Sequence, residues 1–197
     1  MPPVLVDPQK VHEFKDAQSF HDWLAKHHDR ETELWIKIHK KGSDLPSISH
    51  VEAIDAALCW GWIDAIRKGF DDRSFLQRYT PRGKKSTWSK VNVDNVTRLI
   101  AEGRMTGHGL RHVEAAKADG RWDKAYRIKD AELPADLRAA IDAEPKAQAM
   151  FATLSSQNRF ALIFRTNAMK TAAGRKKRIA AFVDMLKRGE TIHPQKR

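Results

Sequence analysis

Alternating hydrophobic and polar positions predict a small β-sheet in the N-terminal half of the chain. Over residues 33–40, Leu and Ile alternate with Trp, Lys and His, which is typical of a strand with one buried face. Segments 62–68 and 74–80 also have strand-like composition. The turn between them contains Gly69 and two aspartates, so we expect the two segments to form a β-hairpin.

Helical spacing of apolar residues predicts four helices around this sheet. Three of them are expected to start at a serine, a residue whose side chain caps helix N-termini: Ser19, Ser49 and Ser89. The fourth helix is expected over residues 107–118. In the helix after Ser49, we expect Val51, Ile54 and Leu58 to form the buried stripe. Gly61 is expected to end this helix.

Helix follows helix in the last third of the chain. Residues 121–134 carry no strong periodicity and are expected to be a connector, after which helices start near Pro134, Pro145, Ser155 and Thr171. The apolar stripe of the last helix consists of Ile179, Phe182, Val183 and Leu186. We therefore predict an α+β fold: a small antiparallel or mixed sheet with packed helices, followed by a helical C-terminal third. The expected domains are 1–122, and 123–197 packed on or beside the first.

Charge is distributed unevenly along the 197 residues. The chain has 36 Lys and Arg against 25 Asp and Glu, a net charge of +11. Residues 1–64 carry −4, residues 65–90 carry +6, residues 91–154 are neutral, and residues 155–197 carry +9. Two local basic segments of this kind attract phosphates or acidic partners, or form solvated helix faces.

Composition also excludes several classes of protein. A single cysteine, Cys59, excludes an internal disulfide framework and a cysteine-rich zinc site. No apolar run approaches the length of a membrane span, so we expect no transmembrane segment. The first residues lack a basic region followed by a long apolar run, so we expect a cytoplasmic protein. His108 and His112 have helical i, i+4 spacing, but no third ligand lies nearby, so we expect no metal and no cofactor.

Sequence motifs along most of the chain resemble one family. Examples are residues 57–64 (Ala-Leu-Cys-Trp-Gly-Trp-Ile-Asp), 72–82 (Asp-Arg-Ser-Phe-Leu-Gln-Arg-Tyr-Thr-Pro-Arg), 86–92 (Ser-Thr-Trp-Ser-Lys-Val-Asn) and 151–159 (Phe-Ala-Thr-Leu-Ser-Ser-Gln-Asn-Arg). These segments resemble the YdeI/OmpD-associated family of bacteriocin-protection proteins. The family name implies an association with bacteriocin resistance and with an outer-membrane porin, and it implies no catalytic residues.

Acidic and basic side chains near the predicted hairpin form the first candidate site. Asp55 lies on the helix after Ser49, and Asp64 follows the Gly61-Trp62 turn. Their carboxylates are expected to pair with arginines of the hairpin and the loop after it: Arg73, Arg78 and Arg82. The cluster is either a polar ligand pocket that Trp62 helps to line, or an ion-pair network that holds the hairpin on the helix.

A basic loop before the helix at Ser89 is the second candidate. Lys84 and Lys85 precede the helix, and Trp88 offers a stacking surface or fills the core. Because the N-terminus of a helix favours anions, this loop is a candidate anion site. It is not a P-loop, since Arg78 stands where that motif requires a glycine.

Cys59 is a third candidate, as a nucleophile. A catalytic cysteine needs a lowered pKa and a nearby base. His50 is the nearest histidine in sequence, and helical geometry places it on the opposite side of the helix. We therefore expect Cys59 to be a buried apolar residue.

Three functions remain open from the sequence. The preferred hypothesis is a non-enzymatic binding or stress-protection protein that recognises an anionic small molecule or an acidic protein partner. It would use the basic hairpin and loop. The alternatives are a small enzyme with an Asp- and Arg-lined pocket, and a nucleic-acid-associated protein that uses the basic C-terminal helix. The oligomeric state is left open.

Overall fold

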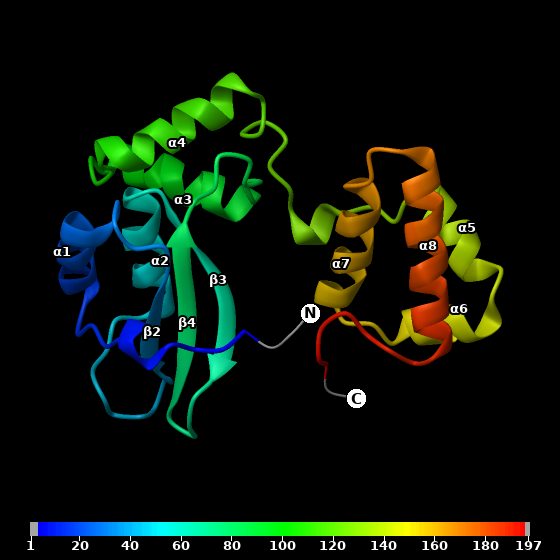
Figure 1. Ribbon diagram of the computed structural model, residues 1–197, viewed down its shortest axis with the longest axis horizontal. Coiled ribbons are helices and arrows are strands. Elements are labelled where there is room, and N and C mark those ends of the chain that lie inside the picture. Colours follow the sequence, from blue (N-terminus) through cyan, green and yellow to red (C-terminus); the bar gives the residue numbers. More distant parts are fainter. Residues whose placement is uncertain (1–3, 196–197) are drawn as a thin grey trace. The chain divides into compact units, whose positions relative to one another are not determined.

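A four-stranded mixed sheet forms the centre of the N-terminal part of the chain. The computed structural model describes residues 4–195 (Figure 1). The strands are β1 (Val11–His12), β2 (Leu34–His39), β3 (Trp62–Gly69) and β4 (Ser74–Pro81), and their order in the sheet is β1-β2-β4-β3. β1 runs parallel to β2, whereas β4 runs antiparallel to both β2 and β3. The predicted hairpin and the mixed sheet are therefore confirmed.

Four α-helices accompany this sheet, as the sequence predicts. They are α1 (Ala17–His27), α2 (His50–Cys59), α3 (Lys90–Ala101) and α4 (Gly107–Ala118), preceded by the 3-10 helix η1 (Pro8–Lys10). One core joins α1 and α2 to the inner face of the sheet, where Leu34, Ile36 and Ile38 are buried. A second core joins α2 to α3 and α4, and Trp88 and Leu99 are among its buried residues.

Several local expectations differ from the structure. Val51 is 66% exposed, because the buried side of α2 is formed by residues such as Ala53, Ala57 and Leu58 instead. Asp16 caps α1, and Ser19 is the third residue of the helix, where it completes a capping box with Asp16. The two-residue strand β1 was not predicted, because a pair of residues carries no detectable alternation.

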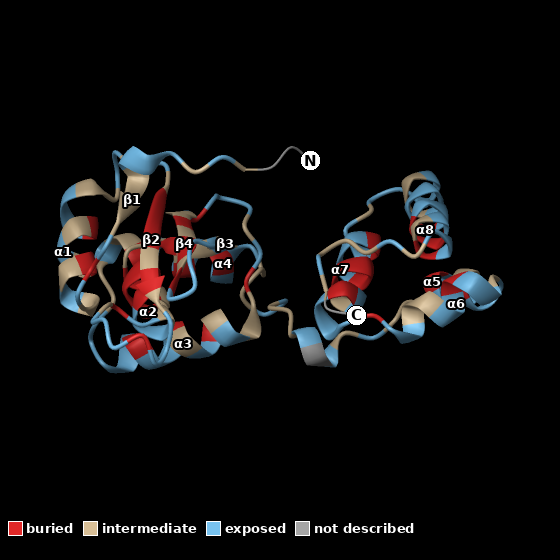
Figure 2. Cartoon of the chain, turned by 90° about the horizontal axis from the view of Figure 1, so that it is seen from below, coloured by how far each residue is buried: buried red, intermediate tan, exposed pale blue. Residues whose placement is uncertain are grey.

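The C-terminal part is a bundle of four α-helices with its own core. They are α5 (Ala135–Asp142), α6 (Pro145–Ala152), α7 (Ser156–Asn167) and α8 (Ala172–Lys187), after the 3-10 helix η2 (Ile128–Asp130). The predicted stripe of α8 is buried in this core, together with residues of the neighbouring helices such as Leu137, Ile141 and Leu162. Figure 2 shows the buried positions on α5, α7 and α8. The α+β prediction with a helical C-terminal third is therefore confirmed.

Contacts divide the chain into two compact units. Unit 1 comprises residues 1–125 and unit 2 comprises residues 126–197. That the chain consists of two domains, 1–122 and 123–197, stays a prediction until each part is shown to fold alone. No helix within residues 4–195 is long and apolar enough to cross a membrane.

Candidate functional site

Asp55 lies in an ion-pair network between α2 and α3. Asp55 is only 6% exposed. Arg98 Nη2 donates to both carboxylate oxygens at 2.8 and 2.6 Å, and Arg104 Nη1 lies 3.7 Å from Oδ2. Hydrogen bonds to Asp55 and Glu102 raise the pKa of Arg98. Asp55 is therefore part of an ion-pair network, but its partners lie on α3 and the segment after it, and not on the hairpin as the sequence predicts.

The hairpin arginines have separate partners. Arg78 on β4 makes two close contacts with Glu33, at 2.7 Å from Nε and 2.5 Å from Nη2. The guanidinium of Arg73 donates to the backbone carbonyl of Ser43. Asp64 is half-buried on β3, opposite Tyr79 in the sheet register. The sequence-predicted Asp/Arg residues therefore do not gather in one pocket.

Trp62 is a core residue of unit 1. It is 1% exposed, and its indole Nε1 donates to the backbone carbonyl of His28 at 3.2 Å. The hydrogen bond ties the start of β3 to the end of α1. Trp62 therefore positions these elements and presents little surface to a ligand.

Arg82 and Trp88 meet at the base of the predicted basic loop. The guanidinium of Arg82 lies 3.7 Å from the centroid of the Trp88 ring, which is a cation–π contact. Both residues are buried, at 4% and 2% exposure. Of the two roles that the sequence allows for Trp88, it therefore has the second: its ring fills the core and is not available for stacking on a ligand.

Further contacts hold the loop between these two residues. Arg82 Nη1 donates to the Thr87 carbonyl at 3.0 Å, and Arg121 Nη1 donates to the Ser86 carbonyl at 2.8 Å. Lys84 and Lys85 are exposed, and neither makes a hydrogen bond or ion pair with any residue in the described range. We call residues 82–88 the basic loop.

The basic loop leads directly into α3. Ser89 caps this helix, because its Oγ accepts a hydrogen bond from the Asn92 amide at 3.2 Å. The first turn of α3 contains no acidic residue. Lys84 and Lys85 therefore lie just before the N-terminus of α3, and no acidic side chain in the first turn of this helix offsets their charge.

Cys59, and His108 with its structural neighbour His28, lack the features of a catalytic or metal site. Cys59 is 2% exposed, and burial raises the pKa of its thiol to about 11. His28 Nε2 and His108 Nδ1 share a hydrogen bond of 3.0 Å, so these imidazoles contact each other. Among residues 4–195, no group of three His, Cys, Asp or Glu side chains is arranged to hold a metal ion.

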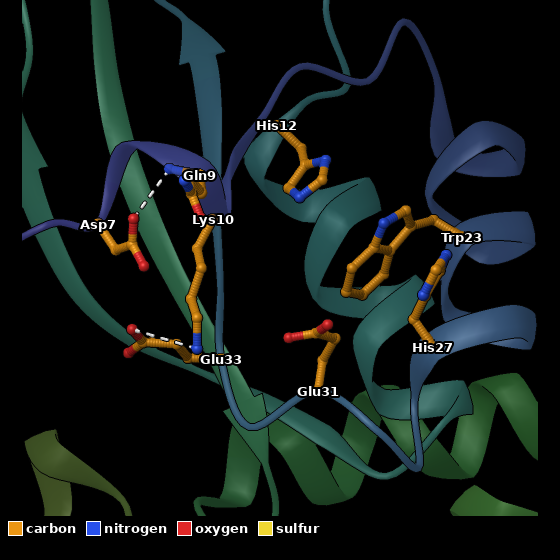
Figure 3. A pocket seen from close by; sticks show the side chains of 8 residues that line it. All are labelled: Asp7, Gln9, Lys10, His12, Trp23, His27, Glu31 and Glu33. Carbon is orange, nitrogen blue, oxygen red and sulfur yellow. Dashed lines mark hydrogen bonds and ion pairs between the residues drawn. The ribbon is translucent and has the colours of Figure 1, made fainter.

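A pocket that the sequence did not predict lies beside β1. Its volume is about 260 Å³, and Figure 3 shows the eight side chains around it, from η1, β1, α1 and the segment before β2: Asp7, Gln9, Lys10, His12, Trp23, His27, Glu31 and Glu33. We call it the β1 pocket. The local sequence signal for it is weak: Trp23 and His27 are spaced by four residues and therefore lie on one face of the first helix.

Two family models match separate segments of the chain. A domain of unknown function, DUF8412, matches residues 12–112. The family described as "Bacteriocin-protection, YdeI or OmpD-Associated" matches residues 130–189. No curated protein and no solved structure matches the chain significantly.

These matches refine the resemblance seen in the sequence. The resemblance is confirmed for residues 130–189, which lie in unit 2 and include the motif at 151–159. The motifs at 57–64, 72–82 and 86–92 fall in the segment that DUF8412 matches. Since that segment covers slightly more than half of the 197 residues, the chain belongs to the DUF8412 family, and its residues 130–189 match the family described as bacteriocin-protection, YdeI or OmpD-associated.

Proposed function

We propose that this protein is a non-enzymatic binding protein whose basic loop recognises an anionic ligand or an acidic partner. The observation that carries the proposal is the pair of exposed, unpartnered lysines, Lys84 and Lys85, on a loop whose two ends are anchored. A loop held in one conformation binds with a smaller loss of entropy than a mobile one.

Two electrostatic features support an anion at this place. The partial positive charge at the N-terminus of α3 adds to the charge of the two lysines. Lys90, the first residue of α3, is 3.3 Å from Asp94 and is partly neutralised. The ligand contacts are therefore assigned to Lys84 and Lys85, with backbone amides at the start of α3.

The arginines receive a supporting role in this proposal. Arg82 holds the loop through Thr87 and Trp88, while Arg73 and Arg78 are engaged by Ser43 and Glu33. Replacing Arg82 would disturb the fold of the loop and would confuse a binding measurement. A test of binding should therefore change the lysines alone.

The test compares two double variants that each lose two positive charges. Lys84→Gln/Lys85→Gln removes the proposed contacts, and Lys26→Gln/Lys41→Gln removes two exposed lysines elsewhere in unit 1. Binding of inorganic pyrophosphate is measured by titration calorimetry. We expect at least about a tenfold loss of affinity in the first variant and little change in the second. Equal affinity in both variants would refute the proposal.

The enzyme alternative receives less support. Asp55, one of its two proposed acid/base residues, accepts two hydrogen bonds from Arg98 and is nearly inaccessible. A general acid or base must reach a proton on the substrate. Asp64 is the remaining carboxylate for such a role, and the β1 pocket does not include it.

Nucleic-acid association through α8 is a second candidate, because unit 2 is strongly basic. Residues 126–197 contain 15 Lys and Arg against 7 Asp and Glu, a net charge of +8. Lys176 and Lys177 are exposed in the first half of α8. Deleting residues 171–197 would remove Phe182 and Leu186 from the core, so charge variants are the better test.

Lys176→Gln/Lys177→Gln should weaken DNA binding and reduce its salt dependence if α8 contacts phosphates. A matched control is Lys146→Gln/Lys170→Gln, which removes two other exposed lysines of unit 2. Unaltered DNA binding and salt dependence in the α8 variant would reject this candidate.

A further inference from the structure

We propose that the β1 pocket binds a small organic ammonium ion whose apolar part is aromatic. The pocket lies apart from the basic loop in sequence and is lined by different residues, so this inference is independent of the proposed anion site. Three properties of the pocket lead to this ligand class: an aromatic wall, an unpartnered carboxylate and a small volume.

The aromatic wall is built on Trp23. The rings of His27 and Trp23 are stacked with their centroids 4.7 Å apart, and the ring centroid of His12 lies 5.4 Å from that of Trp23 in a tilted contact. Trp62 holds the indole from the core side in an edge-on contact at 6.1 Å. A tryptophan fixed in this way offers a preformed surface for an aromatic group or a cation.

Glu31 supplies the carboxylate. In Figure 3 it lies between the side of the pocket formed by Lys10 and Glu33 and the side formed by Trp23 and His27. Glu31 is half-buried and makes no side-chain hydrogen bond or ion pair with any residue from 4 to 195. A carboxylate that is half-buried without a partner attracts an ammonium group.

The other charged groups of the pocket already have partners. Glu33 is bound by Arg78 at 2.5 Å and lies 4.0 Å from Lys10. Asp7 caps η1 by accepting a hydrogen bond from the Gln9 amide at 3.0 Å. Glu31 is therefore the lining carboxylate that remains free for a ligand.

The histidine on β1 is compatible with a cationic ligand. Burial and the neighbouring His27 lower the pKa of His12, with an opposing contribution from Glu31. The lowered pKa favours the neutral form of His12, which does not repel an ammonium ion. Its ring nitrogens can donate or accept a hydrogen bond, which would favour a ligand with a polar substituent on the aromatic ring.

The volume limits the size of the ligand. At about 260 Å³, the pocket is slightly smaller than the about 300–1,000 Å³ of pockets for drug-sized molecules. An arylalkylamine with a single ring is of suitable size. Its ammonium group would contact Glu31 while its ring packs on Trp23.

The experiment titrates the full-length protein with 2-phenylethylamine and, separately, with phenylacetate, which has the same ring and the opposite charge. Chemical shifts and calorimetry report the affinity. We expect saturable binding of the amine, and at least about a tenfold loss of amine affinity in Glu31→Gln, which removes the charge but keeps the shape. Phenylacetate should bind at least about tenfold more weakly than the amine.

Two control variants accompany this measurement. Asp29→Asn removes an exposed carboxylate outside the pocket, and Lys84→Gln/Lys85→Gln changes the basic loop. Both should bind the amine like the wild type. The inference is overturned if the wild type shows no saturable binding of the amine, if Glu31→Gln binds it unchanged, or if phenylacetate binds equally well.

Discussion

Asp55 shows how one buried charge joins distant parts of the chain. It lies on α2, and its two hydrogen bonds come from Arg98 on α3, 43 residues later. Because the side chain of Asp55 is almost inaccessible to water, its hydrogen bonds with Arg98 replace the contacts with water that an exposed carboxylate would make. The carboxylate is therefore assigned to stability.

Replacing Asp55 by Asn tests this assignment. The substitution leaves Arg98 and Arg104 without their shared carboxylate and should lower the free energy of unfolding by about 1–3 kcal/mol. Urea denaturation measures the change. Asp22→Asn, at an exposed position of α1, is the control and should change stability by less than about 0.5 kcal/mol. Equal effects of the two substitutions would contradict the role of the network.

Cys59 is expected to be unreactive in the folded protein. Burial raises the pKa of its thiol to about 11, so only a small fraction is thiolate at pH 8. Reaction with a disulfide reagent such as DTNB should be slow in buffer and complete rapidly in denaturant. Fast modification of the native protein would show that the thiol is accessible and activated, against the structure.

At the level of elements, the close approach of α2 and α4 depends on a glycine. A Cβ atom at Gly109 would lie 2.8 Å from the Leu58 carbonyl oxygen, which is too close for a stable contact. Gly107, in the same helix, has nothing within 4 Å of such an atom. Alanine substitutions at Gly109 and Gly107 therefore compare a crowded and an open position of the same helix.

Gly109→Ala should therefore lower the free energy of unfolding by about 1–3 kcal/mol, because the backbone of α2 must move. Gly107→Ala should leave it unchanged or raise it by up to about 1 kcal/mol, since alanine reduces the freedom of the unfolded chain. Thermal and urea unfolding compare the two. A greater loss of stability in Gly107→Ala would be inconsistent with the packing of α2 on α4.

Sequence patterns predicted the elements better than the sites. Residues 33–40 and the serine caps at Ser49 and Ser89 identified β2, α2 and α3, because alternation and capping are local signals. The partner of Asp55 and the walls of the β1 pocket come from segments far apart in sequence. Only the fold brings such residues together. The prediction that Val51 is buried is wrong, because the buried side of α2 is formed largely by its small alanines.

At the scale of the whole molecule, we expect the free energy of unfolding to decrease at acidic pH because of buried histidines in unit 1. Burial lowers the pKa of His12, His50 and His112, and nearby arginines add to the effect at His50 and His112. Below pH about 6.5 the unfolded chain therefore binds more protons than the folded one, so the free energy of unfolding decreases as pH falls.

Urea titrations of the protein between pH 7.5 and about pH 5.5 test whether the free energy of unfolding decreases as pH falls. This interval is chosen because the carboxylates with lowered pKa titrate mainly below it. His112→Gln should weaken the dependence on pH across this interval. Stability that is constant or that rises toward pH 5.5 would contradict the burial of neutral histidines.

The two units differ in charge as well as in architecture. Unit 1 has 21 Lys and Arg against 18 Asp and Glu, whereas most of the net charge of +11 lies in unit 2. Within unit 1, we propose ligands of opposite charge for the two sites: an anion at the exposed lysines of the basic loop and an ammonium ion at the carboxylate of the β1 pocket. Net charge alone therefore does not identify the ligand of this protein.

Residue-resolved NMR during a titration with inorganic pyrophosphate tests the central proposal most directly. We predict saturable shifts of the amides from Ser86 to Asn92, at the basic loop and the start of α3, and their loss in Lys84→Gln/Lys85→Gln. Shifts confined to other residues, or the same shifts in the wild type and the variant, would contradict anion recognition by the basic loop.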